Sequence, residues 1–290
     1  MHIKLFFVLL LLGLPSIAIA KADLVVGVSI LPQKYFVQRI AGNTTEVIVM
    51  VGSGYNPAIY EPRPKQLSKL SKASIYFLAG VPFEKKWVKV FLKNNPSMTQ
   101  ISMTRDISLR KYHESSMDKH SHDNEGHPDN VDPHFWLNPL LVKIAAKTVL
   151  DTLIQKNPEK ENFYQKNYQS FVNDLEGLDK YIRESMVKTK IKNFSVFHPS
   201  WGYFADAYGL KQIAIEVQNR HSGAKTLNET IQQIRKLEIK VIFVQKQFSE
   251  TDAEMIARET DAQLVKVDPL AENYIENMKY VAHVFLKALQ

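Results

Sequence analysis

Five of the nine histidines in this 290-residue chain lie within one short polar stretch. They are His113, His120, His122, His127 and His134. Neutral imidazole is the commonest metal ligand among protein side chains, so the stretch predicts either a set of weak ligands or one ligand held in a defined place. The chain has no cysteine, which excludes thiolate metal sites, disulfides and a cysteine nucleophile.

Three potential ligands lie where the sequence predicts a stiff backbone. His198 and Asp268 each follow an apolar strand-like run, and His134 lies where the polar stretch returns to apolar sequence. Each of the three adjoins a proline, which fixes its own backbone and restricts its neighbour. Taken singly, such a histidine is often a structural residue and such an aspartate often caps a turn. Taken together with the histidine-rich stretch, the three favour a metal site.

The pattern of apolar residues predicts strands that alternate with helices. Strand-like runs lie at 24–30, 46–52, 74–80, 193–199, 211–217, 240–248 and 263–270. This alternation is typical of βαβ units and therefore of an α/β fold with parallel sheets. Ligands of such folds bind beyond the carboxyl ends of the strands, which is where we expect His198 and Asp268. Residues 112–133 interrupt the pattern and predict a long polar loop.

A long helix is predicted over residues 159–189, because apolar residues recur there three and four positions apart. This stripe consists of Tyr164, Tyr168, Phe171, Leu175, Leu178 and Ile182. We therefore expect an N-terminal α/β lobe at 21–157, a stiff linking helix at 158–189 and a C-terminal α/β lobe at 190–290. Bending the helix would break packed turns, so we expect little motion of one lobe against the other.

The first 20 residues have the pattern of a secretory signal peptide. Lys4 is followed by an apolar run too short to span a bilayer, and Ala18-Ile19-Ala20 is a small-x-small cleavage sequence. We expect cleavage near Ala20 and export to the periplasm, with free secretion as the alternative. The net charge of +7 comes from dispersed lysines, which is typical of a solvated surface rather than of nucleic-acid binding. No later stretch predicts membrane insertion.

Several segments, in this order, resemble the metal-binding proteins of bacterial zinc and manganese ABC importers of the cluster A-I type. They are VVGVSILPQKYFVQRIAG, YEPRPKQLSKLSKASIYFLAG, DPHFWLNP, HPSWGYFADAYGL and VDPLAENYIENM. The periplasmic zinc-binding type is the most similar. The resemblance implies two lobes joined by a rigid helix, one metal site in the cleft between them, and delivery of the metal to a membrane permease by a monomer that is not an enzyme.

The resemblance also implies the ligands His134, His198 and Asp268. The family's remaining ligand is a histidine in a Pro-His-x-Tyr-Glu-Pro motif, but Ala58 occupies that position here. Zinc is usually four-coordinate, so a water, a loop histidine or Glu61 is needed to complete the shell. The four histidines of the loop, at 113, 120, 122 and 127, are therefore possible auxiliary ligands, and otherwise they form only a polar loop.

Imidazole favours Zn²⁺ over Mn²⁺, for which carboxylates are more usual ligands, so His198 favours zinc as the transported ion. Other functions stay open on the sequence alone. Three ligands and an open position also describe a catalytic zinc site, although the chain has no HExxH motif. An adhesin, or a carrier of an organic ligand, is a further alternative.

Overall fold

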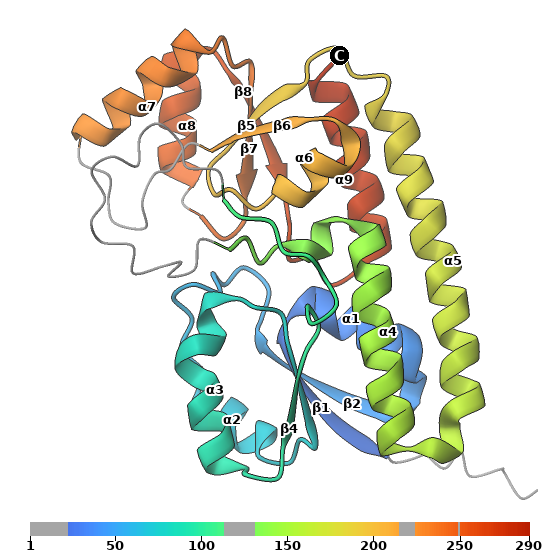
Figure 1. The fold of residues 1–290 in the computed structure, drawn as a ribbon. Helices are drawn as coiled ribbons and strands as arrows, with labels where there is room; N and C mark the ends of the chain where they lie inside the picture. The colour runs from blue at the N-terminus through green and yellow to red at the C-terminus, as the bar shows by residue number, and fades with distance from the viewer. Residues whose placement is uncertain (1–22, 113–130, 215–223, 249) are drawn as a thin grey trace, which may run out of the picture.

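The computed structural model describes residues 23–112, 131–214, 224–248 and 250–290. The expected signal peptide and the four loop histidines, His113, His120, His122 and His127, lie outside the described residues. The described chain forms two α/β lobes, one above the other, with long helices along one side of both (Figure 1). The expected fold class is confirmed.

The N-terminal lobe contains a parallel sheet with the strand order β2-β1-β3-β4. Its strands are β1 (Leu24–Ile30), β2 (Thr45–Val51), β3 (Ile75–Leu78) and β4 (Thr99–Ser102). Its helices are α1 (Leu31–Ala41), α2 (Pro64–Leu70) and α3 (Pro82–Asn94). Each of these helices has a proline in its first turn, where a missing backbone N–H costs no hydrogen bond.

The C-terminal lobe repeats this plan with the strand order β6-β5-β7-β8, again all parallel. Its strands are β5 (Asn193–Val196), β6 (Lys211–Ala214), β7 (Val241–Gln245) and β8 (Gln263–Val267). Its helices are α6 (Gly202–Tyr208), α7 (Ala224–Lys236), α8 (Glu250–Thr260) and α9 (Tyr274–Ala288). The strands β5 and β8 therefore end at the same side of one sheet, with β7 between them.

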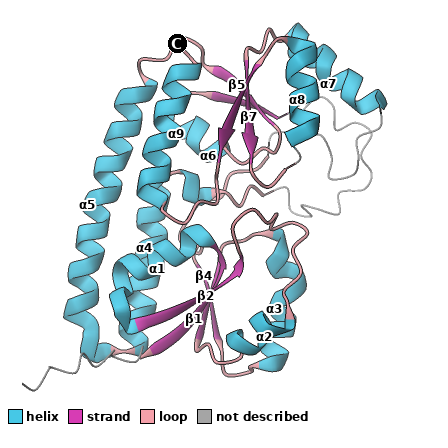
Figure 2. Cartoon of the chain, turned by 180° about the vertical axis from the view of Figure 1, so that it is seen from behind, coloured by secondary structure: helices cyan, strands magenta, loops and turns pink. Residues whose placement is uncertain are grey.

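Two helices that follow the first sheet and precede the second in the sequence connect the lobes. They are α4 (Pro139–Lys156) and α5 (Glu161–Met186), with a 3-10 turn at Pro158–Lys160 between them. The helix α5 runs beside both lobes and lies against α9 (Figure 2). One cluster of buried apolar side chains extends from β1 through α4 and α5 to α9, so the two lobes share a core. Phe171 and Leu175 on α5 are fully buried in that core.

Some elements were not predicted from the sequence, and some predicted bounds differ from the observed ones. Helix α3 and strand β4 were not predicted, and β4 is only partly buried along its length, which leaves no clear alternation to detect. The predicted helix 159–189 is a 3-10 turn followed by α5, which ends at Met186. The predicted strand 211–217 ends at Ala214 within the described residues.

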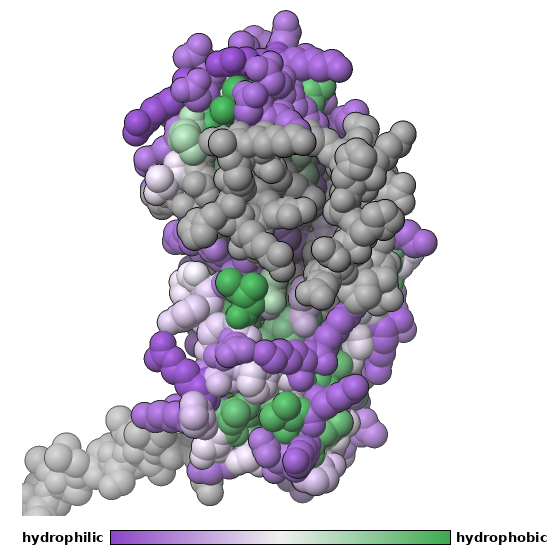
Figure 3. Space-filling model, turned by 90° about the vertical axis from the view of Figure 1, so that its left-hand side faces the viewer, coloured by the Kyte–Doolittle hydropathy of each residue, from purple (hydrophilic) through white to green (hydrophobic). Residues whose placement is uncertain are grey.

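Figure 3 shows the face at the left of Figure 1, where the described residues in view are mostly hydrophilic at the far end of the C-terminal lobe, and hydrophobic side chains are scattered over the N-terminal lobe. Across the described ranges, the helices are too short or too polar to cross a lipid bilayer.

Candidate metal site

His134 lies at the start of the segment that leads into α4. It precedes a 3-10 turn at Phe135–Leu137, and its side chain is almost completely buried. Its backbone N–H donates to Asp132 Oδ1 over 3.0 Å, which closes a tight turn around Pro133. The backbone at His134 is therefore fixed by its neighbours, as the flanking proline predicted, although no strand of the described chain ends directly before it.

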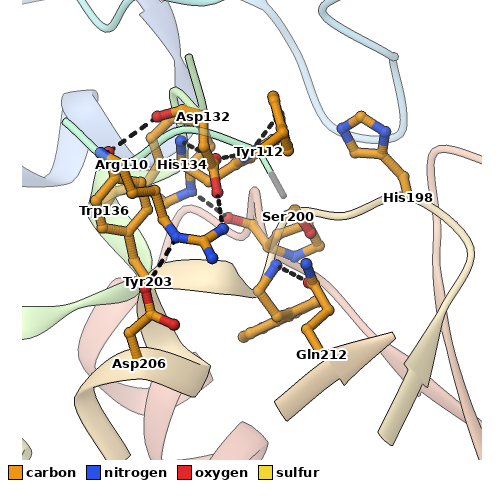
Figure 4. Close-up of polar contacts among 12 residues, drawn as sticks. Arg110, Tyr112, Asp132, His134, Trp136, His198, Ser200, Tyr203, Asp206 and Gln212 are labelled. Carbon is orange, nitrogen blue, oxygen red and sulfur yellow. Dashed lines mark hydrogen bonds and ion pairs between the residues drawn. The ribbon is translucent and has the colours of Figure 1, made fainter. Parts of the chain in front are cut away.

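The carboxylate of Asp132 also fixes the imidazole ring of His134. Asp132 Oδ1 lies 2.7 Å from His134 Nδ1, and the Tyr112 hydroxyl lies 3.4 Å from the same nitrogen (Figure 4). Because an ionised carboxylate is only an acceptor, the proton of the neutral ring belongs on Nδ1. This leaves Nε2 with its lone pair available for a metal, in the arrangement common to metal-binding histidines and their carboxylate partners.

Asp132 is fully buried and forms an ion pair with Arg110, whose guanidinium Nη1 lies 2.8 Å from Asp132 Oδ2. Burial by itself disfavours the charged carboxylate. The hydrogen bonds from His134 and Arg110 outweigh this effect and lower the pKa of Asp132 below its usual value. Asp132 is therefore ionised at neutral pH and can orient the ring of His134.

His198 lies two residues beyond β5, and its ring lies close to that of His134. The two imidazole ring centroids are 5.2 Å apart and the ring planes are inclined by 70°. The ring of His198 stacks on Phe248, at 5.3 Å and 22°. Its backbone carbonyl accepts hydrogen bonds from Ser200 N and from the side-chain amide of Gln245. The structure therefore brings together two of the three predicted ligands, which are 64 positions apart in the sequence.

Asp268 follows β8 directly and is 9% exposed. Its Oδ1 atom accepts hydrogen bonds from Gln247 Nε2 and from Leu270 N, both over 3.0 Å. Its Oδ2 atom lies 3.6 Å from Lys246 Nζ. Within the part of the chain that the structure describes, no three histidine, aspartate or glutamate side chains form a group that could hold a metal. Asp268 thus stays a predicted ligand.

One hydrogen bond brings the segments of His134 and Asp268 together. The indole Nε1 of the buried Trp136 donates to the carbonyl oxygen of Pro269 over 2.8 Å. Trp136 is two residues after His134, and Pro269 is the neighbour of Asp268. The rings of Trp136 and His134 are also in contact, with centroids 5.1 Å apart. The three predicted ligands therefore belong to one region of the molecule.

The remaining position considered from the sequence, Glu61, lies in an exposed part of the chain. Its carboxylate forms an ion pair with Lys86 over 2.5 Å, and both side chains are exposed. The contact with Lys86 lowers the pKa of Glu61. Ala58, which occupies the place of the family histidine, is exposed as well. Glu61 as an auxiliary ligand stays a prediction.

Asp132 and Arg110 were not singled out from the sequence, although Asp132 holds the ring of His134 and Arg110 is bound to Asp132. The signal for Asp132 was its place two residues before His134 across a proline, which allows a side chain to bond back to the following backbone N–H. Arg110 gave no local signal, because its role depends on contacts between segments that are far apart in the sequence.

Comparisons with known proteins show the family of the chain. Residues 26–288 match the family model ZnuA, described as zinc-uptake complex component A, periplasmic. The chain is 29% identical over 262 residues to the zinc-binding lipoprotein AdcA of Streptococcus pneumoniae, a match that covers 86% of this chain and 52% of AdcA. It is 27% identical over 239 residues to the high-affinity zinc uptake system protein ZnuA of Bacillus subtilis, covering 80% and 74% of the two chains.

The fold is also similar to that of a solved structure, a zinc-bound deletion mutant of ZnuA. The TM-score is 0.82, the identity is 34%, and the match covers 93% of this chain and 99% of that one. The chain spans about half the length of the streptococcal relatives that it matches.

Proposed function

This chain belongs to the ZnuA family of periplasmic zinc-uptake components, and we propose from that premise that it captures Zn²⁺ between its two lobes and delivers it to a membrane permease of an ABC importer. The observation that carries the proposal is the pair formed by His134 and His198. Their rings lie edge to face on segments attached to different lobes, and Asp132 holds the ring of His134 with Nε2 available.

The separation of the two rings is compatible with a shared zinc ion. With Zn–N bonds of about 2.0–2.1 Å, the ion lies about 3.2 Å from each ring centroid, and a tetrahedral angle separates the centroids by about 5 Å. The observed separation is 5.2 Å. Two imidazole ligands favour Zn²⁺ over Mn²⁺, for which oxygen ligands are preferred. If the Asp268 carboxylate moved away from Lys246 and Gln247, it could serve as the third ligand.

The proposal extends to the location and the mode of action. The first 20 residues direct export to the periplasm, where a monomer with a shared core between its lobes carries zinc to the permease. The expected division into lobes at 21–157 and 190–290, with a linking helix at 158–189, belongs to the same proposal. Its support is the family and the presence of two separate sheets with equivalent strand orders.

Metal titration of the chain from residue 21 onward tests the proposal. We expect the metal-free protein to bind one Zn²⁺ tightly, with a Kd below about 1 μM, and to bind Mn²⁺ more weakly. His134→Ala, His198→Ala and Asp268→Ala are each expected to weaken this tight binding. His283→Ala is a matched control, because His283 is exposed on α9. Zinc binding weaker than micromolar, or tight binding that survives loss of both His134 and His198, would contradict the proposal.

A further inference from the structure

We propose that Arg110 is a positioning residue for the metal site. By bridging the two lobes, Arg110 sets the separation between His134 and His198. Gly202 is required next to it, because any larger residue would displace the Arg110 guanidinium. The inference rests on the proposed function, since it concerns the same pair of ligands. Arg110 lies eight residues beyond β4 and makes contacts with both sides of the site. We call Arg110, Asp132, Gly202, Tyr203 and Asp206 the Arg110 clamp.

The guanidinium of Arg110 joins two carboxylates that belong to different segments. Its Nη1 atom donates to Asp132 Oδ2 over 2.8 Å, and its Nε atom donates to Asp206 Oδ2 over 3.0 Å. Asp132 holds the ring of His134, whereas Asp206 lies on α6. The planar fork of arginine is suited to two such contacts at once, and the single ammonium of lysine cannot reproduce them.

Tyr203, also on α6, closes the same bridge through its hydroxyl group. The hydroxyl accepts a hydrogen bond from the backbone N–H of Arg110 over 2.9 Å and donates one to the carbonyl oxygen of Asp132 over 2.9 Å. Four hydrogen bonds thus connect Arg110, Asp132 and α6. The backbone N–H of Asp132 adds a fifth by donating to the carbonyl of Arg110. Side chain and backbone both fix the position of Asp132.

The Arg110 clamp is connected to His198 through α6, because α6 begins shortly after His198 in the chain. Helix α6 begins at Gly202, four residues after His198. The intervening backbone is held in turn, since Trp201 N donates to Gln212 Oε1 on β6 over 2.7 Å. One end of the clamp therefore fixes the ring of His134, and the other end fixes the helix attached to the segment of His198. The separation of the two ligand rings follows from this connection.

Gly202 is the residue that makes room for the guanidinium. A Cβ atom built on Gly202 would lie 1.8 Å from Arg110 Nη1, 2.4 Å from Cζ and 2.9 Å from Asp132 Oδ2. Contacts of this kind do not occur between real atoms, so even alanine would force the guanidinium to move. Arg110 itself is mostly covered, with 14% of its side chain exposed, and Asp132 is fully buried. A shift of the guanidinium would lengthen its hydrogen bonds to Asp132 and Asp206.

The test measures the zinc affinity of Arg110→Met, Arg110→Lys and Gly202→Ala, together with the visible absorption of bound Co²⁺, which reports the geometry of the ligands. We expect each variant to bind zinc about 10-fold more weakly or worse, as for other residues that orient metal ligands, and to alter the Co²⁺ spectrum. Arg110→Lys keeps the positive charge beside Asp132. If Arg110→Met does not fold, the zinc affinity of Arg110→Lys therefore tests whether the guanidinium positions the ligands.

A double variant separates the steric role of Gly202 from any other. Gly202→Ala is expected to weaken zinc binding strongly in the natural chain but only slightly in the Arg110→Met background. In that background the guanidinium with which the alanine Cβ atom would clash is absent. This non-additivity is the signature of two residues that act through one contact. Equal losses in both backgrounds would overturn the role given to Gly202.

Arg39→Met is the matched control. Arg39 also joins two elements through an aspartate, since its Nη2 atom lies 2.5 Å from Asp174 Oδ2, and its guanidinium lies over the ring of Phe171. We expect this variant to lose stability without any change in zinc affinity or in the Co²⁺ spectrum. The inference is wrong if the Arg110 variants behave like Arg39→Met, or if Arg39→Met alters the Co²⁺ spectrum as they do. The proposed function fails separately, if the natural chain itself binds no zinc tightly.

Discussion

Asp132 Oδ1 lies 2.7 Å from His134 Nδ1, although the two residues are separated only by Pro133. A carboxylate that is fully buried beside a potential ligand has two roles in this structure. It selects the ring nitrogen that carries the proton, and it neutralises the positive charge of Arg110. Both roles can be tested by removing the charge of Asp132 while keeping its shape.

Asp132→Asn is expected to weaken zinc binding about 10-fold, because the amide orients and polarises the imidazole less well than a carboxylate. It also leaves the guanidinium of Arg110 without a buried anion, which we expect to lower the free energy of unfolding by about 3 kcal/mol. Chelator competition and denaturant titration measure the two effects. Asp174→Asn is the control, since Asp174 forms an exposed ion pair whose loss costs about 1 kcal/mol or less.

The stabilisation by Asp132 has a defined pH dependence. Its pKa is lower in the folded chain than in the unfolded chain, so its contribution is complete above the unfolded value of about 3.9 and is lost as the pH falls towards the folded value. The contribution of the Asp132 charge to the difference in unfolding free energy between the natural chain and Asp132→Asn should therefore still be present at pH 5, and it should decrease only as the pH falls below about 4. A difference that already disappears by pH 5 would contradict the lowered pKa.

Trp136→Phe is expected to lower the free energy of unfolding by about 1–2 kcal/mol and to weaken zinc binding several-fold. The substitution keeps a buried ring but removes the hydrogen bond to the carbonyl of Pro269, which ties the segment of His134 to the segment of Asp268. Trp87→Phe is the control, because within the described residues the Trp87 indole N–H has no hydrogen-bond partner. Equal effects of the two substitutions on zinc binding would show that the Trp136 bond does not position Asp268.

Glu84 should make the stability of the protein fall as the pH rises from about 4.5 to about 7. The carboxyl group is buried beside Ser29 and the backbone N–H groups of Ala79 and Gly80, and burial raises its pKa to about 7. Between the unfolded value near 4.5 and this folded value, the folded chain keeps a proton that the unfolded chain releases, so raising the pH favours unfolding.

The natural chain should therefore lose up to about 3 kcal/mol relative to Glu84→Gln over that pH range, because glutamine does not titrate. Denaturant titrations at several pH values measure the difference. Glu46→Gln, on the exposed side of β2, controls for the loss of a carboxylate. Parallel pH profiles for the natural chain and Glu84→Gln would exclude a raised pKa at Glu84.

Gly177→Ala is expected to raise the free energy of unfolding by about 0.5–1 kcal/mol and to leave zinc affinity unchanged. Gly177 lies on the exposed side of α5, and a Cβ atom there would meet no other atom within 4 Å. Alanine therefore gains helix propensity without a steric cost. Gly209→Ala should have the opposite effect, since Gly209 ends α6 with a φ of +68°, where a side chain is strained. Thermal or denaturant unfolding of both variants decides the matter.

The sequence contained most of the information needed for the fold. Buried strands such as β1 and β7 appear as continuous apolar runs, and the face of α5 that carries Phe171 and Leu175 has a clear helical period. These signals are local, because each depends on the spacing of residues within one element. Strand β4 was missed, since only part of each of its side chains is buried and the order of strands in the sheet supplies the rest.

The sequence by itself determined which residues had the chemistry for a metal site. The imidazoles of His134 and His198 and the carboxylate of Asp268 stand out by residue type and flanking prolines, and His198 and Asp268 also by their positions after predicted strands. Only the tertiary structure decided which of them meet. It places the ring centroids of His134 and His198 5.2 Å apart and leaves Asp268 hydrogen-bonded to Gln247. It also places the Arg110 clamp between the lobes. The physical reason is that a ligand's position depends on contacts between distant segments, such as the guanidinium fitted against Gly202, and residue spacing along the chain does not encode such contacts.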